Sequence, residues 1–290
     1  KGNASIDLTK FQDCPVSSTT EDAEKEVLSL ATKIEAEFER NMKFEDPSMS
    51  WYGNEKHVGF QTQIERLGVI AEVFVEGEVP TSPSVQAVIE PNDIKAGGSV
   101  SIVSTHEQKL YGQVYTGCVN PASEQYRPNI MDIGLKIGKY LAAQGVIGHF
   151  SCDFIATQKP DGSCNLNAIE INLRQGGTTH PHATMALLCG GCICSDGVFR
   201  TNENEVRTYV ATDCHSLTPC SESHLIDAIN SKNDPQASKI RWNKDERVGV
   251  VFHLFKFAPR GRIGFTAIGR NMTEAQLLFD EAEQFLAQIK

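Results

Sequence analysis

Alternating polar and apolar side chains predict a strand over residues 169–174 of the 290-residue chain. Successive side chains of a strand point to opposite faces, so Glu170, Asn172 and Arg174 share one face. A carboxylate, an amide and a guanidinium in one row suit a cation and a phosphate better than an apolar core. Residues 175–179 contain two glycines and two threonines, which predict a turn rich in hydrogen-bond donors after this strand.

A second alternating segment, residues 149–155, predicts a partner strand whose polar face carries Asp153. The Asp161 and Gly162 pair between the two strands is a strong hairpin signal. If these two residues form the loop, Asp153 faces Glu170 directly. Opposed carboxylates destabilise a sheet, and they invite a shared proton or a hard cation such as Mg²⁺. A shifted register, or a pair that points into water, remains the alternative.

The rest of the chain predicts a mixed α+β protein. Apolar residues at helical spacing predict helices over 20–44, 130–144, 181–188 and 272–289, and a shorter one near 223–229. Apolar runs predict strands over 68–76, 84–90, 99–104, 113–118, 247–257 and 263–269, of which the last two should form a hairpin. Residues 195–247 are otherwise expected to be polar and irregular.

Composition narrows the class of protein. The net charge of −10 argues against a nucleic-acid surface, and no apolar run has the length of a membrane span. Nine cysteines in a chain of this length predict a reducing, cytoplasmic setting rather than a disulfide framework. The chain begins at Lys1 inside a glycine-containing loop, so we expect a fragment boundary there.

Two further patterns admit a functional and an ordinary interpretation. His180, His182 and the cysteines at 189, 192 and 194 have spacings found in zinc sites, but buried cysteines are common in cores. The acidic pair around a glycine at 76–78 could bind sugar hydroxyls, or it could be a solvated turn.

Several segments, in order along the chain, resemble the ATP-grasp superfamily. Within it they resemble the branch that includes the pheganomycin-type peptide ligase and the eukaryotic IQ-motif-containing protein H. The matching segments are GNASIDL (2–8), AEVFVEGE (71–78), SPSVQ (82–86), STHEQ (104–108), GQVYTGC (112–118), GVIGHFSCDF (145–154), EINLRQGGTTHP (170–181), GVVFHL (249–254) and GRIGFTAIG (261–269). The Glu-x-Asn-x-Arg strand followed by Gly-Gly-Thr-Thr-His-Pro is the most specific of them.

The resemblance implies an α+β ATP-grasp fold of antiparallel sheets with flanking helices, truncated at the N-terminus, plus a small C-terminal α+β extension. Residues 1–190 are the expected ATP-grasp domain, with a smaller lobe over 1–79 and a catalytic lobe over 80–190. Residues 191–290 are the expected family-specific C-terminal region. Other domains of a longer parent chain are expected partners, with no nucleic acid and no membrane.

The resemblance also implies roles for individual residues around ATP and Mg²⁺. Three oxygen-bearing side chains are implied metal ligands: Asp153, Glu170 and Asn172. Arg174 is the implied catalytic residue, steadying the transferred phosphate. The implied nucleotide-binding residues are Glu72, Val73, Phe74 and Val75 for adenine, Glu78 for the ribose, and Gly2 and Asn3 in the glycine loop. His106 and Gln108 are expected near the substrate.

Three functions are compatible with these patterns. The first is an ATP- and Mg-dependent carboxylate–amine ligase, of the peptide type, that works through an acyl phosphate. The second is a catalytically silent ATP-binding regulatory or scaffold module of a larger eukaryotic IQ-motif protein. The third is a metal-binding module built on the His180 to Cys194 cluster. Asp153, Glu170, Asn172 and Arg174 together favour the first two over the third.

Overall fold

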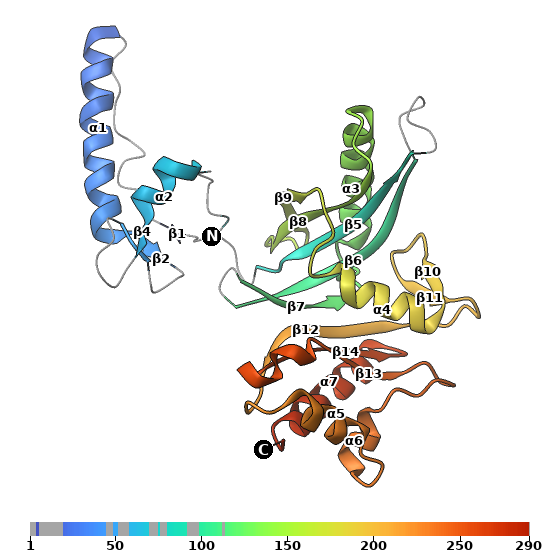
Figure 1. Cartoon of the computed structure of the whole chain (residues 1–290). Helices are drawn as coiled ribbons and strands as arrows, with labels where there is room; N and C mark the ends of the chain where they lie inside the picture. Colours follow the sequence, from blue (N-terminus) through green and yellow to red (C-terminus); the bar gives the residue numbers. More distant parts are fainter. Residues whose placement is uncertain are drawn as a thin grey trace. The chain divides into compact units, whose positions relative to one another are not determined.

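The computed structural model in Figure 1 describes residues 4–5, 20–44, 49–51, 58–69, 75, 80–91, 99–111 and 114–289. The chain divides into two compact units, Lys1–Phe74 and Val75–Lys290. Among the described residues, no helix combines the length and the apolar character that a bilayer crossing needs.

The first unit consists of helices and short strand pairs. Its core includes Trp51 and Phe60, with Phe38 from the long helix packed at the Trp51 ring. That helix was predicted to run to residue 44 and ends at Asn41 instead, and the short polar segment at 61–66 proves to be helical. The elements are β1 (Ala4–Ser5) with β2 (Lys43–Phe44), β3 (Met49–Ser50) with β4 (Val58–Gly59), α1 (Thr20–Asn41) and α2 (Phe60–Leu67).

The second unit is built on an eight-stranded sheet in the order β13-β14-β12-β7-β6-β5-β8-β9, in which every neighbouring pair is antiparallel (Figure 1). The strands are β5 (Pro83–Glu90), β6 (Ser99–Tyr111), β7 (Val114–Asn120), β8 (Gly148–Gln158), β9 (Cys164–Asn172), β12 (Thr208–Ser216), β13 (Gly249–His253) and β14 (Arg262–Gly269). The β9 strand therefore forms one edge of the sheet and β13 the other.

Helices cover the two faces of this sheet unequally. One face packs against α3 (Arg127–Ala143) beneath β5 and β8, and against α5 (Glu222–Asn230), α6 (Pro235–Ile240) and α7 (Met272–Leu286) beneath β12 to β14. The opposite face packs against α4 (Thr179–Cys189), and a small hairpin of β10 (Gly191–Ile193) and β11 (Phe199–Thr201) follows that helix. A 3₁₀ helix, η3 (Phe255–Arg260), connects β13 to β14.

Side-chain alternation explains the two faces. On β5, Val85 and Ala87 are fully buried under α3, while Ser84 and Gln86 are buried on the opposite face. The same alternation along β8 buries Phe154 under α3 and turns Asp153 to the α4 side. The α4 side of β5, β6 and β8 is therefore a polar interior, which is unusual for a sheet face and marks it as a candidate site.

The fold class expected from the sequence, an α+β protein with a large antiparallel sheet and flanking helices, is confirmed. The hairpin of β13 and β14 is also confirmed. The strand predicted over 247–257 is shorter, because Leu254 adopts a left-handed conformation (φ 63°) that ends β13. The strand predicted over 68–76 lies largely outside the described residues.

Strand β12 is missing from the sequence prediction. Residues 208–212 are all buried because the strand lies in the middle of the sheet with helices on both faces, so its sequence shows no polar–apolar alternation. The β12, β13 and β14 strands continue the sheet that carries β5, β8 and β9. The predicted division of the chain at residue 190 stays a prediction.

Candidate functional site

Four side chains form a row across the polar face of the sheet. Glu170 on β9 pairs with Asp153 on β8, Asp153 pairs with Ser84 on β5, and Ser84 pairs with His106 on β6. Directly paired residues of antiparallel strands point to the same side. The predicted opposition of Asp153 and Glu170 is therefore confirmed, and the two carboxylates lie at the β9 end of the row.

Hydrogen bonds tie these carboxylates to their neighbours. The Ser84 hydroxyl donates to Asp153 Oδ1 at 2.6 Å, and Gln86 Nε2 donates to that hydroxyl at 3.3 Å. Asn172 Nδ2 donates to Asp153 Oδ2 at 3.4 Å and to Glu170 Oε2 at 3.1 Å. Asp153, Glu170 and Asn172 thus converge on one point, and the amide nitrogen supplies the positive end of a dipole there.

The opposition of the two acids depends on a β-bulge. The turn between β8 and β9 contains five residues, 159–163, because Gln158 pairs with Cys164; the predicted two-residue turn is wrong. In that register Asp153 would pair with Ile169. Instead the pairing shifts between Phe154 and Asp153, so that Ile169 is the extra residue and Glu170 moves into position. Bulges re-aim side chains in this way beside functional sites.

Burial sets the protonation behaviour of Asp153. Removal from water raises the pKa of this carboxyl above its ordinary value, and the negative charge of Glu170 acts in the same direction. Hydrogen bonds from Ser84 and Gln108 and the positive charge of Arg174 oppose the rise in pKa. A cation bound beside Asp153 would favour its ionised form.

Arg174 lies outside the strand that was predicted to carry it. Strand β9 ends at Asn172, so Arg174 belongs to the segment that leads into α4. Its guanidinium is exposed and donates to the Gln175 carbonyl at 3.2 Å, while its charge still lowers the pKa of Asp153. Arg174 is therefore near the carboxylates, on a segment without regular secondary structure.

The donor set fits a hard cation. Two carboxylates and one amide oxygen are ligands that Mg²⁺ takes, usually with water and phosphate oxygens completing the shell. Asn172 presents its nitrogen to both carboxylates, so a rotation of the amide by half a turn would present its oxygen instead. The residues present therefore fit the metal that the resemblance implies.

The structure describes only some of the other predicted site residues. Val75 is half-buried and outside regular secondary structure. His106 is fully buried and hydrogen-bonded through Nε2 to the Tyr209 hydroxyl, so it supports the row from inside rather than facing a substrate. Gln108 contacts Asp153, in keeping with its predicted place near the site. The predicted nucleotide-binding residues Gly2, Asn3, Glu72, Val73, Phe74 and Glu78 lie outside the described residues.

The alternative zinc cluster is not assembled. His182 is buried with its ring against His106 and Phe199, Cys189 is buried in the core beneath α4, and Cys192 is exposed. Within the described ranges, no group of three or more His, Cys, Asp or Glu side chains could hold a metal ion. The ordinary interpretation of these residues, as core and surface positions, agrees with the structure.

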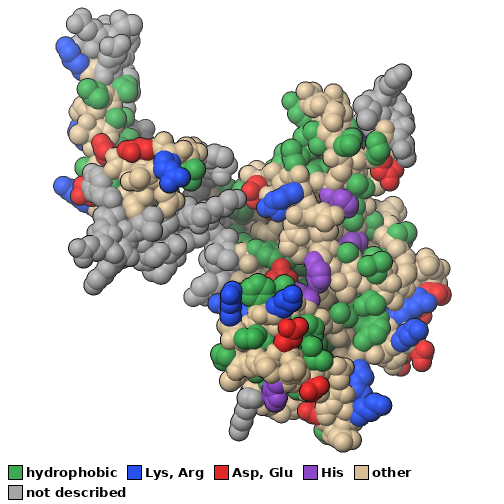
Figure 2. Space-filling model, viewed as in Figure 1, with side chains coloured by type: hydrophobic (Ala, Val, Ile, Leu, Met, Phe, Trp, Pro, Cys, Tyr) green, Lys and Arg blue, Asp and Glu red, His purple; other side chains and the backbone are tan. Residues whose placement is uncertain are grey.

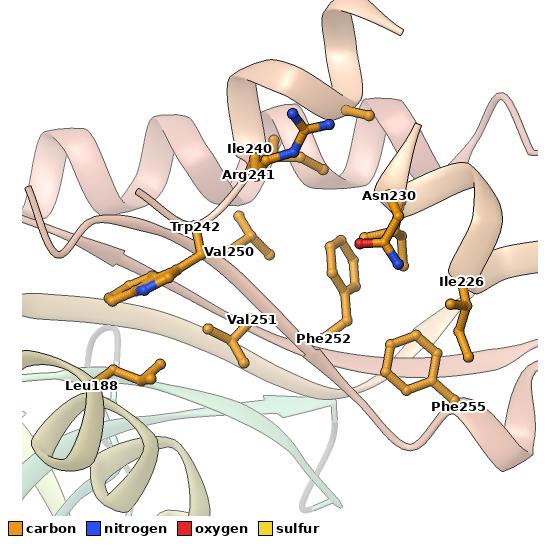
Figure 3. A pocket seen from close by; sticks show the side chains of 12 residues that line it. Leu188, Ile226, Asn230, Ile240, Arg241, Trp242, Val250, Val251, Phe252 and Phe255 are labelled. Atoms are coloured by element: carbon orange, nitrogen blue, oxygen red, sulfur yellow. The ribbon is translucent and has the colours of Figure 1, made fainter. Parts of the chain in front are cut away.

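A separate apolar cleft lies at the other end of the sheet (Figure 3). Its volume is about 330 Å³, and Trp242, Phe252 and Phe255 line it together with side chains of α5 and α6. Arg241 is the single charged residue in its lining. The cleft shares no residue with the carboxylate row.

Comparisons with known proteins identify the family. No protein-family model matches the sequence. The chain is 36% identical over 216 residues to the L-propargylglycine–L-glutamate ligase of Streptantibioticus cattleyicolor, a match that covers 73% of this chain and 42% of the ligase. The match confirms the resemblance to the ATP-grasp superfamily. The narrower kinship with the IQ-motif-containing protein H stays a prediction. The chain spans about two fifths of that ligase.

Solved structures give more distant likenesses. The N5-carboxyaminoimidazole ribonucleotide synthetase of Thermus thermophilus has a TM-score of 0.46 at 13% identity, over 97% of this chain and 71% of its own. The phosphoribosylaminoimidazole carboxylase ATPase subunit of Aquifex aeolicus has a TM-score of 0.45 at 15% identity, over 74% of this chain and 58% of its own. At these values the likeness carries no conclusion about substrates or partners.

Proposed function

We propose that this chain carries the catalytic centre of an ATP- and Mg-dependent carboxylate–amine ligase. The convergence of Asp153, Glu170 and Asn172 beside Arg174 carries the proposal, because this set can hold a cation and a phosphate together. The 36% identity to an amino-acid ligase supports the same class of reaction. The substrates proposed are ATP, a small carboxylate and a small amine.

The proposed reaction has two steps. The terminal phosphoryl group of ATP passes to a carboxylate oxygen, which releases ADP and gives an acyl phosphate. The amine then attacks the acyl carbon, the bond to phosphate breaks, and an amide and inorganic phosphate are formed. Phosphoryl transfer requires positioning and charge neutralisation more than covalent help from the protein.

The residues of the site supply those two requirements. Asp153, Glu170 and Asn172 would hold Mg²⁺, and a bound Mg²⁺ would neutralise phosphate charge and act as a template. The Arg174 guanidinium donates to the oxygens of the transferred phosphate, for which its planar fork is suited. Val75 with Glu72, Val73 and Phe74 would pair with adenine, Glu78 would hold the ribose, and Gly2 and Asn3 would lie over the phosphates.

We place this activity in the cytoplasm, where reducing conditions keep thiols free; the eight cysteines at described positions are all unpaired. Other domains of a longer parent protein are the proposed partners.

Calorimetric titration of the full-length protein with ATP, with and without Mg²⁺, tests the proposal. Magnesium-dependent binding, followed by ADP release in the presence of amino acids, is the expected result. Magnesium-dependent binding without ADP release for any amino acid would favour the catalytically silent module. Absence of nucleotide binding in the folded protein would show the proposed function to be wrong.

A further inference from the structure

Three ionisable side chains form a chain of contacts beside the proposed site. His253 Nε2 lies 3.2 Å from Asp213 Oδ1, and the rings of His253 and His180 have their centroids 4.3 Å apart. His253 is largely buried, with 14% of its side chain exposed, whereas His180 is exposed in the first turn of α4. Figure 2 shows histidines gathered near the middle of the viewed face of the second unit.

The sheet is shaped to make the contact between His253 and Asp213. His253 on β13 pairs with Gly264 on β14, and a Cβ at Gly264 would lie 2.1 Å from His253 Nε2. The imidazole therefore lies over Gly264 and reaches Asp213 on β12, the strand beyond. The pairing of β12 with β14 is bulged between Thr212 and His215, where Asp213 lies. Both the glycine and the bulge allow the contact between His253 and Asp213. Two separate backbone features that favour one contact indicate that the contact has a function.

This chain of contacts lies on the same face as the carboxylate row. Burial raises the pKa of Tyr115, and the charges of Asp213 and Asp153 act in the same direction, so the Tyr115 hydroxyl interacts with both acids. The Tyr115 ring also contacts the turn between Arg174 and α4, because a Cβ at Gly177 would lie 2.6 Å from it. His180 follows this turn directly, which places its exposed ring at the edge of the proposed site.

The electrostatics of His180 suit a proton acceptor. Burial and the neighbouring His253 lower the pKa of His180 below its ordinary value, while Asp213 opposes the fall in pKa. His180 is therefore neutral at pH 7. The second ring nitrogen of His253, Nδ1, is buried and has no hydrogen-bond partner in the described part of the chain. If Nε2–H donates to Asp213, Nδ1 remains an acceptor.

We propose that His180 accepts the proton of the attacking amine, that His253 orients the His180 ring, and that Asp213 stabilises its charged form. This inference rests on the proposed ligase function. As the C–N bond forms, the C–O bond to phosphate breaks and phosphate leaves with its electron pair. The amine proton passes to the His180 ring and then to water. His253, bound to Asp213, thus holds the His180 ring in the orientation that proton transfer requires.

Hydroxylamine provides the test, because it is largely unprotonated at pH 7 and needs no base to trap an acyl phosphate. The full-length protein and its His180→Gln variant are given Mg-ATP and a panel of amino acids as carboxylates, L-glutamate among them. The amine acceptor is hydroxylamine in one series. In the other series it is one of several amino acids, which include L-propargylglycine. We expect His180→Gln to lower amide formation about 100-fold or more, the usual contribution of a general base, and to change hydroxamate formation less than about twofold.

Control variants separate proton transfer from structural damage. His224→Gln replaces an exposed histidine of α5 and should change neither product. Asp213→Asn should move the acidic limb of the pH–rate profile for amide formation to lower pH, because Asp213 raises the pKa of His180. Gly264→Ala should lower amide formation while hydroxamate formation persists, since it displaces the His253 ring.

Equal loss of both products in His180→Gln, or loss of neither, would overturn the inference while leaving the ligase function intact. A wild-type protein that forms no hydroxamate with any amino acid would instead show the ligase function to be wrong.

Discussion

Asp153 and Glu170 lie directly opposite each other on β8 and β9, with the Asn172 amide nitrogen donating to both. Opposed like charges destabilise a sheet, and burial of Asp153 adds to that cost. An arrangement that weakens the free protein and suits a cation is expected where the protein binds that cation.

Glu170→Gln should separate metal binding from folding. The substitution keeps the size of the side chain and removes its charge, so the repulsion of Asp153 disappears. Affinity for Mg-ATP should fall at least about 100-fold, since even the outer partners of metal ligands contribute about 10–100-fold. The melting temperature should not fall. Calorimetry and thermal unfolding measure the two effects, with Glu90→Gln, at the exposed end of β5, as the control. Unchanged affinity in Glu170→Gln would remove Glu170 from the site.

Asp153 should give the protein a distinctive pH dependence. Its pKa is higher in the folded than in the unfolded chain, so the folded state holds more protons as pH rises above the ordinary value of 3.8. The free energy of unfolding therefore decreases through that window, and Asp153→Asn should remove this decrease. Metal affinity should change in the opposite sense, because Mg²⁺ binds the ionised carboxylate. Urea titrations at several pH values, with and without Mg-ATP, measure both trends. A steeper decrease in the variant would contradict the assignment.

The two glycines after Arg174 should respond differently to substitution by alanine. A Cβ at Gly177 would lie 2.6 Å from the Tyr115 ring, whereas a Cβ at Gly176 meets only the end of Arg174 at 3.7 Å. Gly177→Ala should therefore displace the turn or the ring and lower activity about tenfold or more, because a misplacement of about 1 Å can cost roughly 100-fold. Gly176→Ala should be close to neutral. Addition of Tyr115→Leu to Gly177→Ala should restore part of the loss; equal effects of the two alanines would contradict this account of the turn.

Phe265 should be a major contributor to stability. It is fully buried on β14, with its ring 4.8 Å from that of Phe279 and 5.7 Å from that of Phe252. Phe265→Ala should lower the free energy of unfolding by about 3–5 kcal/mol. Tyr140→Ala, at a position 70% exposed on α3, should change it by less than about 0.5 kcal/mol. Urea unfolding curves provide the comparison, and a small effect at Phe265 would mean that the core closes around the missing ring.

Local patterns allowed the sequence to predict the polar face but not how it is assembled. Alternation along β8 and β9 correctly placed Asp153 and Glu170 on one face and opposite each other. That pairing was predicted from a two-residue turn, whereas the protein forms it through a five-residue turn and a bulge at Ile169. The longer turn and the bulge shift the pairing by one residue in opposite directions, so Asp153 still pairs with Glu170. A bulge has no reliable signature in a single sequence, since it depends on the partner strand.

For a related reason, contacts between distant segments could not be predicted from the sequence. Asp213 lies on a central strand without alternation, and His253 was identified only as part of an apolar strand. Their contact requires the order β13-β14-β12 and the absence of a side chain at Gly264. The available signals were a histidine two residues after Val251 and a glycine within β14, and neither indicates a partner until the strand order is known.

The position of β9 at the edge of the sheet has a consequence for dynamics. Within the described part of the chain, Glu170 and Asn172 belong to a strand that is hydrogen-bonded on one side only, and Ile171 between them is 47% exposed. Edge strands with exposed backbone open at a lower free energy than the whole domain. The cation site can therefore come apart by local fraying while the rest of the sheet stays folded. Bound Mg-ATP should stabilise β9 against this local unfolding. Slower amide hydrogen exchange confined to β9 would be the measurable effect.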